Sequence, residues 1–103
     1  MQFLVLGYDG KDAQALERRL AVREAHLAGS ERMYAAGQWQ DSGALLDDEG
    51  KMVGSFIVCE YGSREELRSQ WLDSESYVTG EVWKRVEIHP LLVSPRACSK
   101  RDS

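Results

Sequence analysis

The chain has 103 residues, of which 43% are hydrophobic and 29% are charged, and its formal net charge is -4. This length fits one domain with one modest core, and the three Trp, four Tyr and two Phe residues exclude a disordered chain. No apolar run is long enough to span a bilayer, and the acidic balance argues against nucleic acid as a partner.

The two ends of the chain give expectations about location and domain extent. The first seven residues, MQFLVLG, lack the basic start and long apolar stretch of a signal peptide, so we expect a cytoplasmic protein. Residues 94–103 have no apolar periodicity and carry a net charge of +2, which leaves -6 on residues 1–93. We therefore expect one domain over residues 1–93 and a flexible C-terminal tail over residues 94–103.

The N-terminal third of the chain predicts a strand followed by a long helix. Residues 3–8 form a short apolar run typical of a strand. A helical pattern then covers residues 13–36, with Asp12 as the expected N-cap and Gly37 as the expected stop. Because this helix is long, we expect a bend at Gly29-Ser30.

The remainder predicts three more strands and a second helix. The strands are expected over residues 39–46, 52–61 and 82–93, and the capping-box pattern Ser63-x-x-Glu66 opens the helix. Pro90 lacks an amide proton and therefore indicates an edge strand. The order is β-α-β-β-α-β, the ferredoxin-like α+β arrangement with an antiparallel sheet.

A polar stripe divides the first predicted helix. At about 100° per residue, an apolar stripe expected to face the core contains Leu16, Leu20, Leu27 and Tyr34. Beside it, with further apolar residues on its other side, runs a polar stripe of Arg19, Arg23, His26 and Ser30. An unpaired buried charge costs several kcal/mol, so something anionic should meet this stripe.

Two interpretations of this polar stripe are open. In the simpler one, Arg23 pairs with an internal Asp or Glu, and His26 is an ordinary histidine of the surface or core. In the functional one, Arg23 attracts a small anion into a pocket and His26 transfers protons, because its unperturbed pKa lies near neutrality.

Two further segments could contribute to such a pocket. Residues 73–77 contain the carboxylates Asp73 and Glu75, either of which could orient His26, although an ordinary polar helix end explains them too. The sequence Ser42-Gly43-Ala44 interrupts a strand with a glycine, which permits close approach of a ligand or a β-bulge. No phosphate-binding loop, nucleophile elbow or metal motif occurs, so no cofactor or metal is expected.

Residues 19–27, RLAVREAHL, resemble the signature of the YciI-like (YCII-related) family, in which an Arg precedes a helical His-Leu by three positions. The resemblance continues in the same order through nearly the whole chain except its last ten residues. Its further motifs are Gly37, Ser42-Gly43-Ala44, Gly54-Ser55-Phe56-Ile57-Val58, Trp71, Tyr77-Val78 and Val86-Glu87-Ile88-His89-Pro90.

The resemblance implies a ferredoxin-like fold that pairs two sheets across a homodimer, the dimeric α/β-barrel arrangement. It also implies an active site built on a His and an Asp, and the family's His corresponds to His26. The family's Asp belongs to an Asp-Pro-Tyr triplet, but Glu75 and Ser76 precede Tyr77 in this chain. Either Glu75 takes the carboxylate role, or Asp73 does, or the site is degraded; we favour Asp73, because a short carboxylate is better fixed.

The resemblance implies chemistry of the lyase or isomerase type and, together with the polar stripe, predicts a small-molecule enzyme. The enzyme would act on a small organic acid or a hydroxylated ring, with His26 as general acid/base and with Asp73 or Glu75 fixing its tautomer. The expected ligand-binding residues are Arg19, Arg23, Ser42, Gly43 and Tyr77. The alternatives are a non-catalytic metabolite-binding or regulatory module of the same fold, and a cofactor-independent oxygenase suggested by shared architecture alone.

Overall fold

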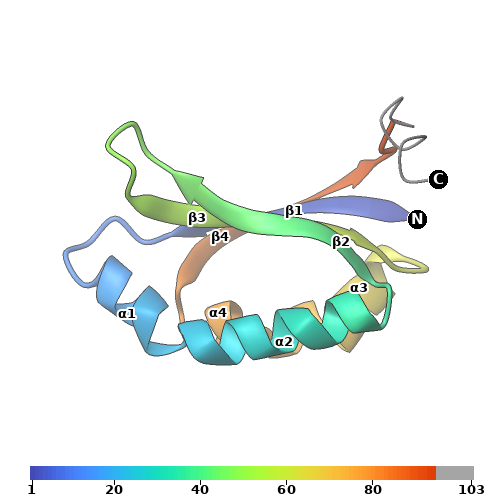
Figure 1. The fold of residues 1–103 in the computed structure, drawn as a ribbon, viewed down its shortest axis with the longest axis horizontal. Helices are drawn as coiled ribbons and strands as arrows, with labels where there is room; N and C mark the ends of the chain where they lie inside the picture. Colours follow the sequence, from blue (N-terminus) through green and yellow to red (C-terminus); the bar gives the residue numbers. More distant parts are fainter. Residues whose placement is uncertain (95–103) are drawn as a thin grey trace.

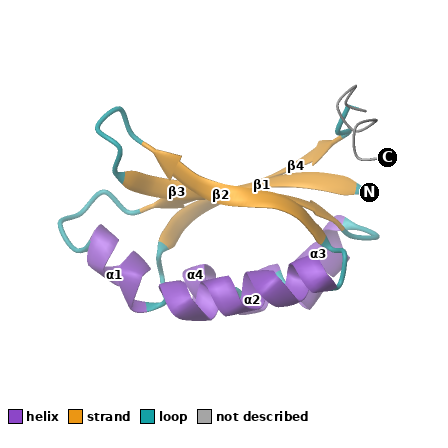
Figure 2. Cartoon of the chain, in the orientation of Figure 1, coloured by secondary structure: helices purple, strands orange, loops and turns teal. Residues whose placement is uncertain are grey.

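The computed structural model describes residues 1–94 as one sheet covered on one face by helices (Figure 1). The order of elements is the predicted β-α-β-β-α-β, with each helical segment divided into shorter helices (Figure 2). The strands are β1 (Gln2–Asp9), β2 (Trp39–Leu46), β3 (Met52–Glu60) and β4 (Trp83–Leu91). The expected tail, apart from Ser94, lies outside the described residues, and so does Cys98.

The four strands form one antiparallel sheet in the order β2-β3-β1-β4. This is the ferredoxin-like topology, in which the first and third strands are central. The proline-containing strand β4 lies at an edge, as its missing amide predicts. In β1, buried and half-buried residues alternate, because successive side chains of a strand point to opposite faces of the sheet.

The first helical segment is two helices, α1 (Ala15–Ala21) and α2 (Arg23–Ala35), and not one bent helix. The chain leaves helical geometry at Val22, whose φ is -116° and ψ is 10°. Gly29 and Ser30, where a bend was expected, both lie within α2, and the interruption of the helical segment falls at Val22 instead. The stop at Gly37 is confirmed, since this glycine adopts a φ of 77°, which side-chain-bearing residues rarely adopt.

The second helical segment contains α3 (Arg64–Gln70), a short 3₁₀ turn η1 (Leu72–Ser74) and α4 (Ser76–Thr79). The predicted capping box opens α3. The Ser63 hydroxyl accepts from the amide of Glu66 at 3.1 Å, and Glu66 Oε2 accepts from the amide of Gly62 at 3.1 Å. The two turns that follow place Glu75 between η1 and α4, where the chain returns toward the sheet.

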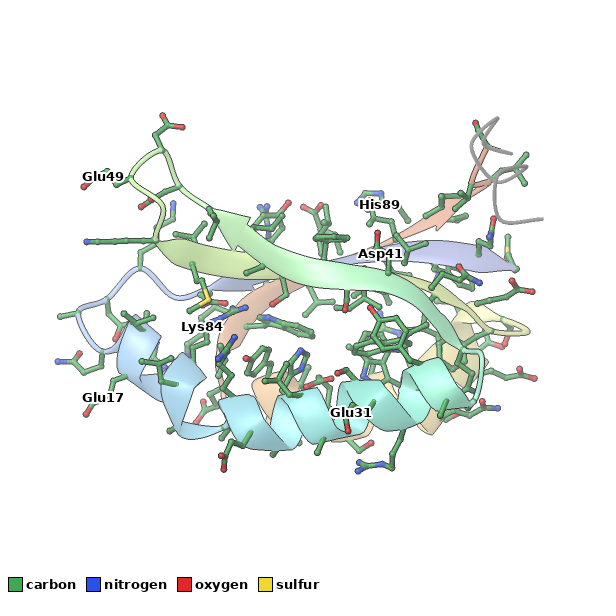
Figure 3. All side chains as sticks on the ribbon, in the orientation of Figure 1. Glu17, Glu31, Asp41, Glu49, Lys84 and His89 are labelled. Carbon is green, nitrogen blue, oxygen red and sulfur yellow. The ribbon has the colours of Figure 1, made fainter. Side chains whose placement is uncertain are left out.

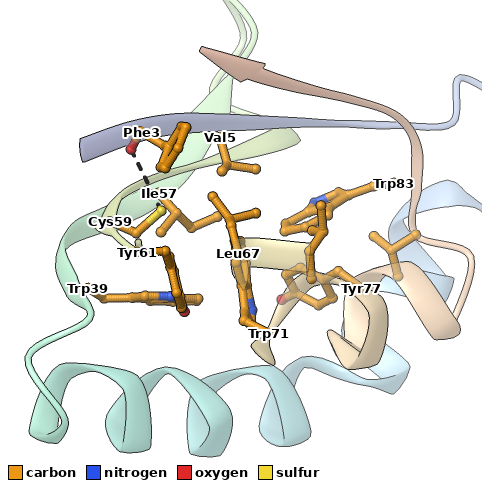
Figure 4. Packing of buried hydrophobic residues seen from close by; sticks show 12 residues of the cluster. Phe3, Val5, Trp39, Ile57, Cys59, Tyr61, Leu67, Trp71, Tyr77 and Trp83 are labelled. Atoms are coloured by element: carbon orange, nitrogen blue, oxygen red, sulfur yellow. Dashed lines mark hydrogen bonds between the residues drawn. The ribbon is translucent and has the colours of Figure 1, made fainter. Parts of the chain in front are cut away.

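The core lies between the sheet and the helices (Figure 4). Each large apolar side chain buried there contributes roughly 1.5–3 kcal/mol of transfer free energy. All three Trp residues belong to it, and Cys59 fills space in it as a fully buried side chain. Its members are Phe3, Val5, Trp39, Ile57, Cys59, Tyr61, Leu67, Trp71, Leu72, Tyr77, Val82 and Trp83.

The expected core-facing stripe of the first helical segment is wrong. Its four members are between 40% and 53% exposed, namely Leu16, Leu20, Leu27 and Tyr34. The sheet-facing side is instead the polar one, where Arg19 and Ser30 are buried and Val22 and Met33 pack on the core. This orientation is tolerated because the buried polar groups find partners on the sheet and on the turn after η1.

The opposite face of the sheet carries no helix within the described chain (Figure 1). The half-buried side chains of β1 point there, and Leu4 pairs across strands with Val58 while Leu6 pairs with Phe56. His89 and Asp41 project from the same face (Figure 3). The domain therefore has two layers, with an apolar strip on its uncovered sheet face.

Candidate functional site

A buried histidine–carboxylate pair joins α2 to the turn between η1 and α4. His26 Nδ1 lies 2.7 Å from Glu75 Oε2, and the two side chains are 11% and 5% exposed. Glu75 also accepts from Trp71 Nε1 at 2.8 Å and from the backbone amide of Tyr77 at 3.1 Å. The carboxylate is thus fixed by three donors, and it fixes the histidine ring in turn.

The environment of Glu75 favours its ionised form. Burial alone would raise the pKa of this carboxyl, but the hydrogen bonds and charge of His26, with the donors Trp71 and Tyr77, hold the pKa below its ordinary value. An ionised Glu75 accepts a hydrogen bond from the Nδ1–H group of His26. In a neutral imidazole, Nε2 then carries the free lone pair.

Tyr77 forms a flat surface against the histidine. Its ring lies 3.9 Å from the ring of His26, with an interplanar angle of 9°. The guanidinium carbon of Arg19 lies 4.8 Å from the centre of the same tyrosine ring, within cation–π range. Burial raises the pKa of Tyr77, so its hydroxyl stays protonated at neutral pH.

Arg19 is the second buried charge on this side of the helices, and strand β1 supplies its counter-ion. Its Nη1 lies 3.0 Å from both carboxylate oxygens of Asp9, and its Nη2 donates to Ser55 Oγ at 2.9 Å. Burial raises the pKa of Asp9, and the guanidinium of Arg19 opposes that rise. The charge of Arg19 is therefore matched within the fold.

A cavity of about 170 Å³ lies between these helices and the sheet. It brings together residues from α1, α2, β2, β3 and α4. Its lining contains all five residues that the sequence suggested for ligand binding, namely Arg19, Arg23, Ser42, Gly43 and Tyr77. His26 and Ser55 also line it. The volume suits a small organic molecule of about one ring.

Arg23 differs from Arg19 in its surroundings. Arg23 is exposed and lies at the rim of the cavity. Within residues 1–94 its guanidinium makes no salt bridge and no side-chain hydrogen bond. The internal ion pair considered for Arg23 is thus made by Arg19. The rim of the cavity therefore carries a positive charge available to a ligand.

Two cavity residues come from strand β2. The hydroxyl oxygens of Ser42 and Tyr34 lie 2.5 Å apart, which ties this edge strand to α2. Gly43 is paired in register with Phe56, and a Cβ built at Gly43 would lie 2.7 Å from the phenyl ring. The register shifts of β2 fall elsewhere, so the glycine makes room for Phe56 and does not form a β-bulge.

The two candidate carboxylates occupy different environments. Asp73 is exposed in η1, and Glu75, not the favoured Asp73, makes the hydrogen bond to His26. The longer side chain of Glu75 also reaches the indole of Trp71. Glu75 therefore lies two residues before Tyr77, at the position that the family resemblance assigns to the Asp of the Asp-Pro-Tyr triplet.

The sequence interpretation missed Asp9 and Ser55. Both lie on the helix-facing side of a strand whose other members on that side are apolar, such as Val5 in β1 and Ile57 in β3. A polar residue in phase with buried positions is a signal that strand alternation could have supplied.

No group of three or more His, Cys, Asp or Glu side chains in residues 1–94 is arranged to hold a metal ion. None of the described helices is long and apolar enough to cross a membrane. A wider hollow of about 690 Å³ lies between the β1–α1 loop and the β2–β3 hairpin, where it is lined by Lys11 and Lys51. It contains neither His26 nor Glu75, so we place the candidate site in the smaller cavity.

The sheet order, the two helical segments and the cavity between them define a protein of the ferredoxin-like α+β fold. A solved structure with this fold is that of 5-chloro-2-hydroxyhydroquinone dehydrochlorinase from Burkholderia phenoliruptrix AC1100. The two superpose with a TM-score of 0.77 over 91% of this chain and 96% of the dehydrochlorinase, at 23% identity.

The family follows from the sequence comparison. The model of the YCII-related domain matches residues 1–92, and the chain belongs to this family. Protein YciI of Escherichia coli O6:H1 is 32% identical over 89 residues, which cover 81% of this chain and 90% of that protein. A protein of Haemophilus influenzae is 30% identical over 81 residues, covering 73% of this chain and 82% of its own length.

Proposed function

We propose that this protein is a small-molecule enzyme that uses His26 and Glu75 for general acid/base chemistry of the lyase or isomerase type. Its substrate would be a small organic acid or a hydroxylated ring. The observation that carries the proposal is the 2.7 Å hydrogen bond between His26 Nδ1 and the buried Glu75, beside a cavity that His26 lines. A metabolite sensor would need the cavity but would not need this pair.

In the proposed reaction, His26 Nε2 removes a proton from an O–H or C–H group of the bound substrate. The imidazolium that forms is stabilised by ionised Glu75 and by the face of the Tyr77 ring. His26 then returns the proton to another atom of the substrate or to a leaving group. The protonation state of the enzyme is restored, and the chemistry requires no cofactor.

Arg23 would hold the negative charge of the substrate. Both arginines line the cavity, but Arg19 forms an ion pair with Asp9, whereas no carboxylate in residues 1–94 forms an ion pair with Arg23. A charge-assisted hydrogen bond from Arg23 would bind a substrate carboxylate or an oxyanion that forms after proton removal.

The structural neighbour supports the substrate class. By its name that enzyme acts on a chlorinated hydroxyhydroquinone, and it was solved in complex with 2,5-dihydroxybenzoquinone. Both molecules are single hydroxylated rings, a size that suits a cavity of about 170 Å³. We further propose that the chain works in the cytoplasm as a homodimer with one such cavity in each subunit.

The test is a screen of the purified protein against small carboxylic acids and phenols, with 2,5-dihydroxybenzoquinone included, first for binding and then for turnover. His26→Ala should abolish turnover of a substrate, and Arg23→Ala should weaken its binding by roughly tenfold or more. The control is Arg64→Ala, since Arg64 is an exposed arginine of α3 that does not line the cavity.

Unchanged turnover in both the His26 and the Arg23 variants would refute the proposal. Binding of a ligand with no turnover of any compound would instead indicate the regulatory module.

A further inference from the structure

Ser55 is a buried hydroxyl at the wall of the candidate cavity that faces the sheet. It lies on β3 between Gly7 of β1 and Ala44 of β2, and it is 2% exposed. Along its side of β3, the next residues are the fully buried Ile57 and Cys59. A polar residue at such a position needs partners for each of its hydrogen-bonding groups.

Two of those groups are already occupied. Ser55 Oγ accepts from Arg19 Nη2 at 2.9 Å and from Trp83 Nε1 at 3.3 Å. A serine hydroxyl has two lone pairs and one proton, so these donors use its accepting capacity. Within residues 1–94 the hydroxyl proton has no acceptor, although Ser55 lines the cavity. This proton is therefore available to a molecule bound in the cavity.

The surrounding structure fixes the two donors that orient Ser55. Asp9 holds Arg19 through both carboxylate oxygens, and Trp83 lies against the sheet in the core (Figure 4). Gly7 makes room for the indole, since a Cβ built there would lie 2.3 Å from it. Donors on an oxygen polarise its O–H bond, and the positive charge of Arg19 strengthens this effect.

We propose that Ser55 donates its hydroxyl proton to an oxygen atom of the substrate. Arg19 then acts as a positioning residue, because it orients Ser55 and does not carry the substrate's charge itself. The inference rests on the proposed function and narrows its substrate class. The substrate bears one acidic group for His26 and Arg23 and a second oxygen, a carbonyl or an enolate, that accepts from Ser55.

The test compares binding of 2,5-dihydroxybenzoquinone to the wild-type protein and to serine variants by isothermal titration calorimetry. Ser55→Ala should raise the Kd by at least about tenfold, and Ser55→Thr, which keeps a hydroxyl, should recover part of the loss. The control is Ser69→Ala, since Ser69 is an exposed serine of α3 that does not line the cavity and whose hydroxyl donates to the Glu66 carbonyl. Its Kd should stay within about twofold of the wild type.

A crystal structure of the wild-type complex gives a readout that does not depend on how the variants fold. We expect a ligand oxygen about 2.5–3.0 Å from Ser55 Oγ. A carbon atom at that place, or an unchanged Kd in Ser55→Ala, overturns the role of Ser55 and leaves the His26 mechanism standing. Failure of the wild type to bind this quinone and the other acids and phenols overturns both proposals.

Discussion

At the residue scale, the site depends on polar and charged side chains that are buried in pairs. His26 with Glu75 and Arg19 with Asp9 each join a helix to a different element, and all four residues are less exposed than the apolar stripe beside them. For the ion pair of Arg19 and Asp9, removing one partner costs about 3–5 kcal/mol, because the other charge is left uncompensated. These pairs therefore fix the position of the helices as well as the chemistry of the cavity.

The depressed pKa of Glu75 makes the stability of the protein depend on pH in a defined direction. Between the folded pKa and the ordinary value of about 4.3, the unfolded chain binds a proton that the folded chain does not. The stabilisation is thus complete above the ordinary value and is lost as the pH falls through the folded one. We expect Glu75→Gln to remove this dependence, so that urea unfolding at pH 7 and pH 3 shows a smaller loss of stability than in the wild type.

Asp73→Asn is the matched control for this measurement. Asp73 lies two residues before Glu75 but is exposed, so its variant should lose stability on acidification as the wild type does. If the free energy of unfolding falls by the same amount between pH 7 and pH 3 in the wild type and in Glu75→Gln, the buried pair does not contribute to stability in acid.

The sequence predicts Arg19 and His26 in one polar stripe, names Glu75 as one of two candidate partners of His26, and does not predict Asp9 as the partner of Arg19. Helical spacing alone places Arg19 and His26 on one face, because seven residues make nearly two turns. Their partners depend on non-local geometry. Asp9 is delivered by the register of β1, and the preference for Asp73 failed because the turns η1 and α4 direct Glu75 inward.

At the element scale, strands were easier to predict than the helices. The bounds of β2 agree with the prediction, and β3 ends one residue earlier than predicted. This agreement is close because the alternation of side chains and a glycine-containing turn define the two strands of a hairpin. The break at Val22 has no such signal, since neither glycine nor proline lies there. The apolar stripe of the first helical segment gave a wrong prediction of the buried face. Apolar periodicity identifies one face of a helix, but here the hydrogen bonds to Glu75 and Asp9 decide which face is buried.

Two glycines in and after α2 should respond to alanine in opposite directions. Gly29 lies within the helix and a Cβ there would meet only a flexible arginine nitrogen at 3.6 Å, so Gly29→Ala should stabilise by about 0.5–1 kcal/mol. Gly37 adopts a φ of 77° with open space around it, so Gly37→Ala should destabilise by about 1 kcal/mol or more. Chemical denaturation measures both, and a destabilised Gly29→Ala would contradict a continuous helix through this position.

At the scale of the whole molecule, residues 1–94 leave two apolar surfaces uncovered. One is the stripe of four separate side chains along α1 and α2, and the other is the sheet face opposite the helices. The sheet face is continuous across three strands, through Leu4, Leu6, Leu45, Phe56 and Val58. An apolar sheet face is normally buried against another layer, and a second copy of the chain would supply that layer.

Polar groups border this sheet face as they would border an interface. On β4, Glu87 accepts from Arg85 at 3.1 Å and is 3.0 Å from His89, and the guanidinium of Arg85 lies 4.3 Å from the ring centre of Tyr8. Together His89 and Arg85 lower the pKa of Glu87, with His89 the larger influence. An apolar centre with a charged rim is the usual anatomy of a subunit interface.

We therefore expect the protein to sediment at twice the mass of its 11.6 kDa chain and to dissociate when the sheet face is charged. Leu6→Asp places a carboxylate at the centre of that face, where dimerisation would bury it unpaired, so analytical ultracentrifugation should show a monomer. Leu20→Asp changes a residue that is 53% exposed on α1 and should remain a dimer. If Leu20→Asp dissociates and Leu6→Asp does not, the subunits meet through their helices, and the two candidate cavities lie near the interface instead of behind the sheets.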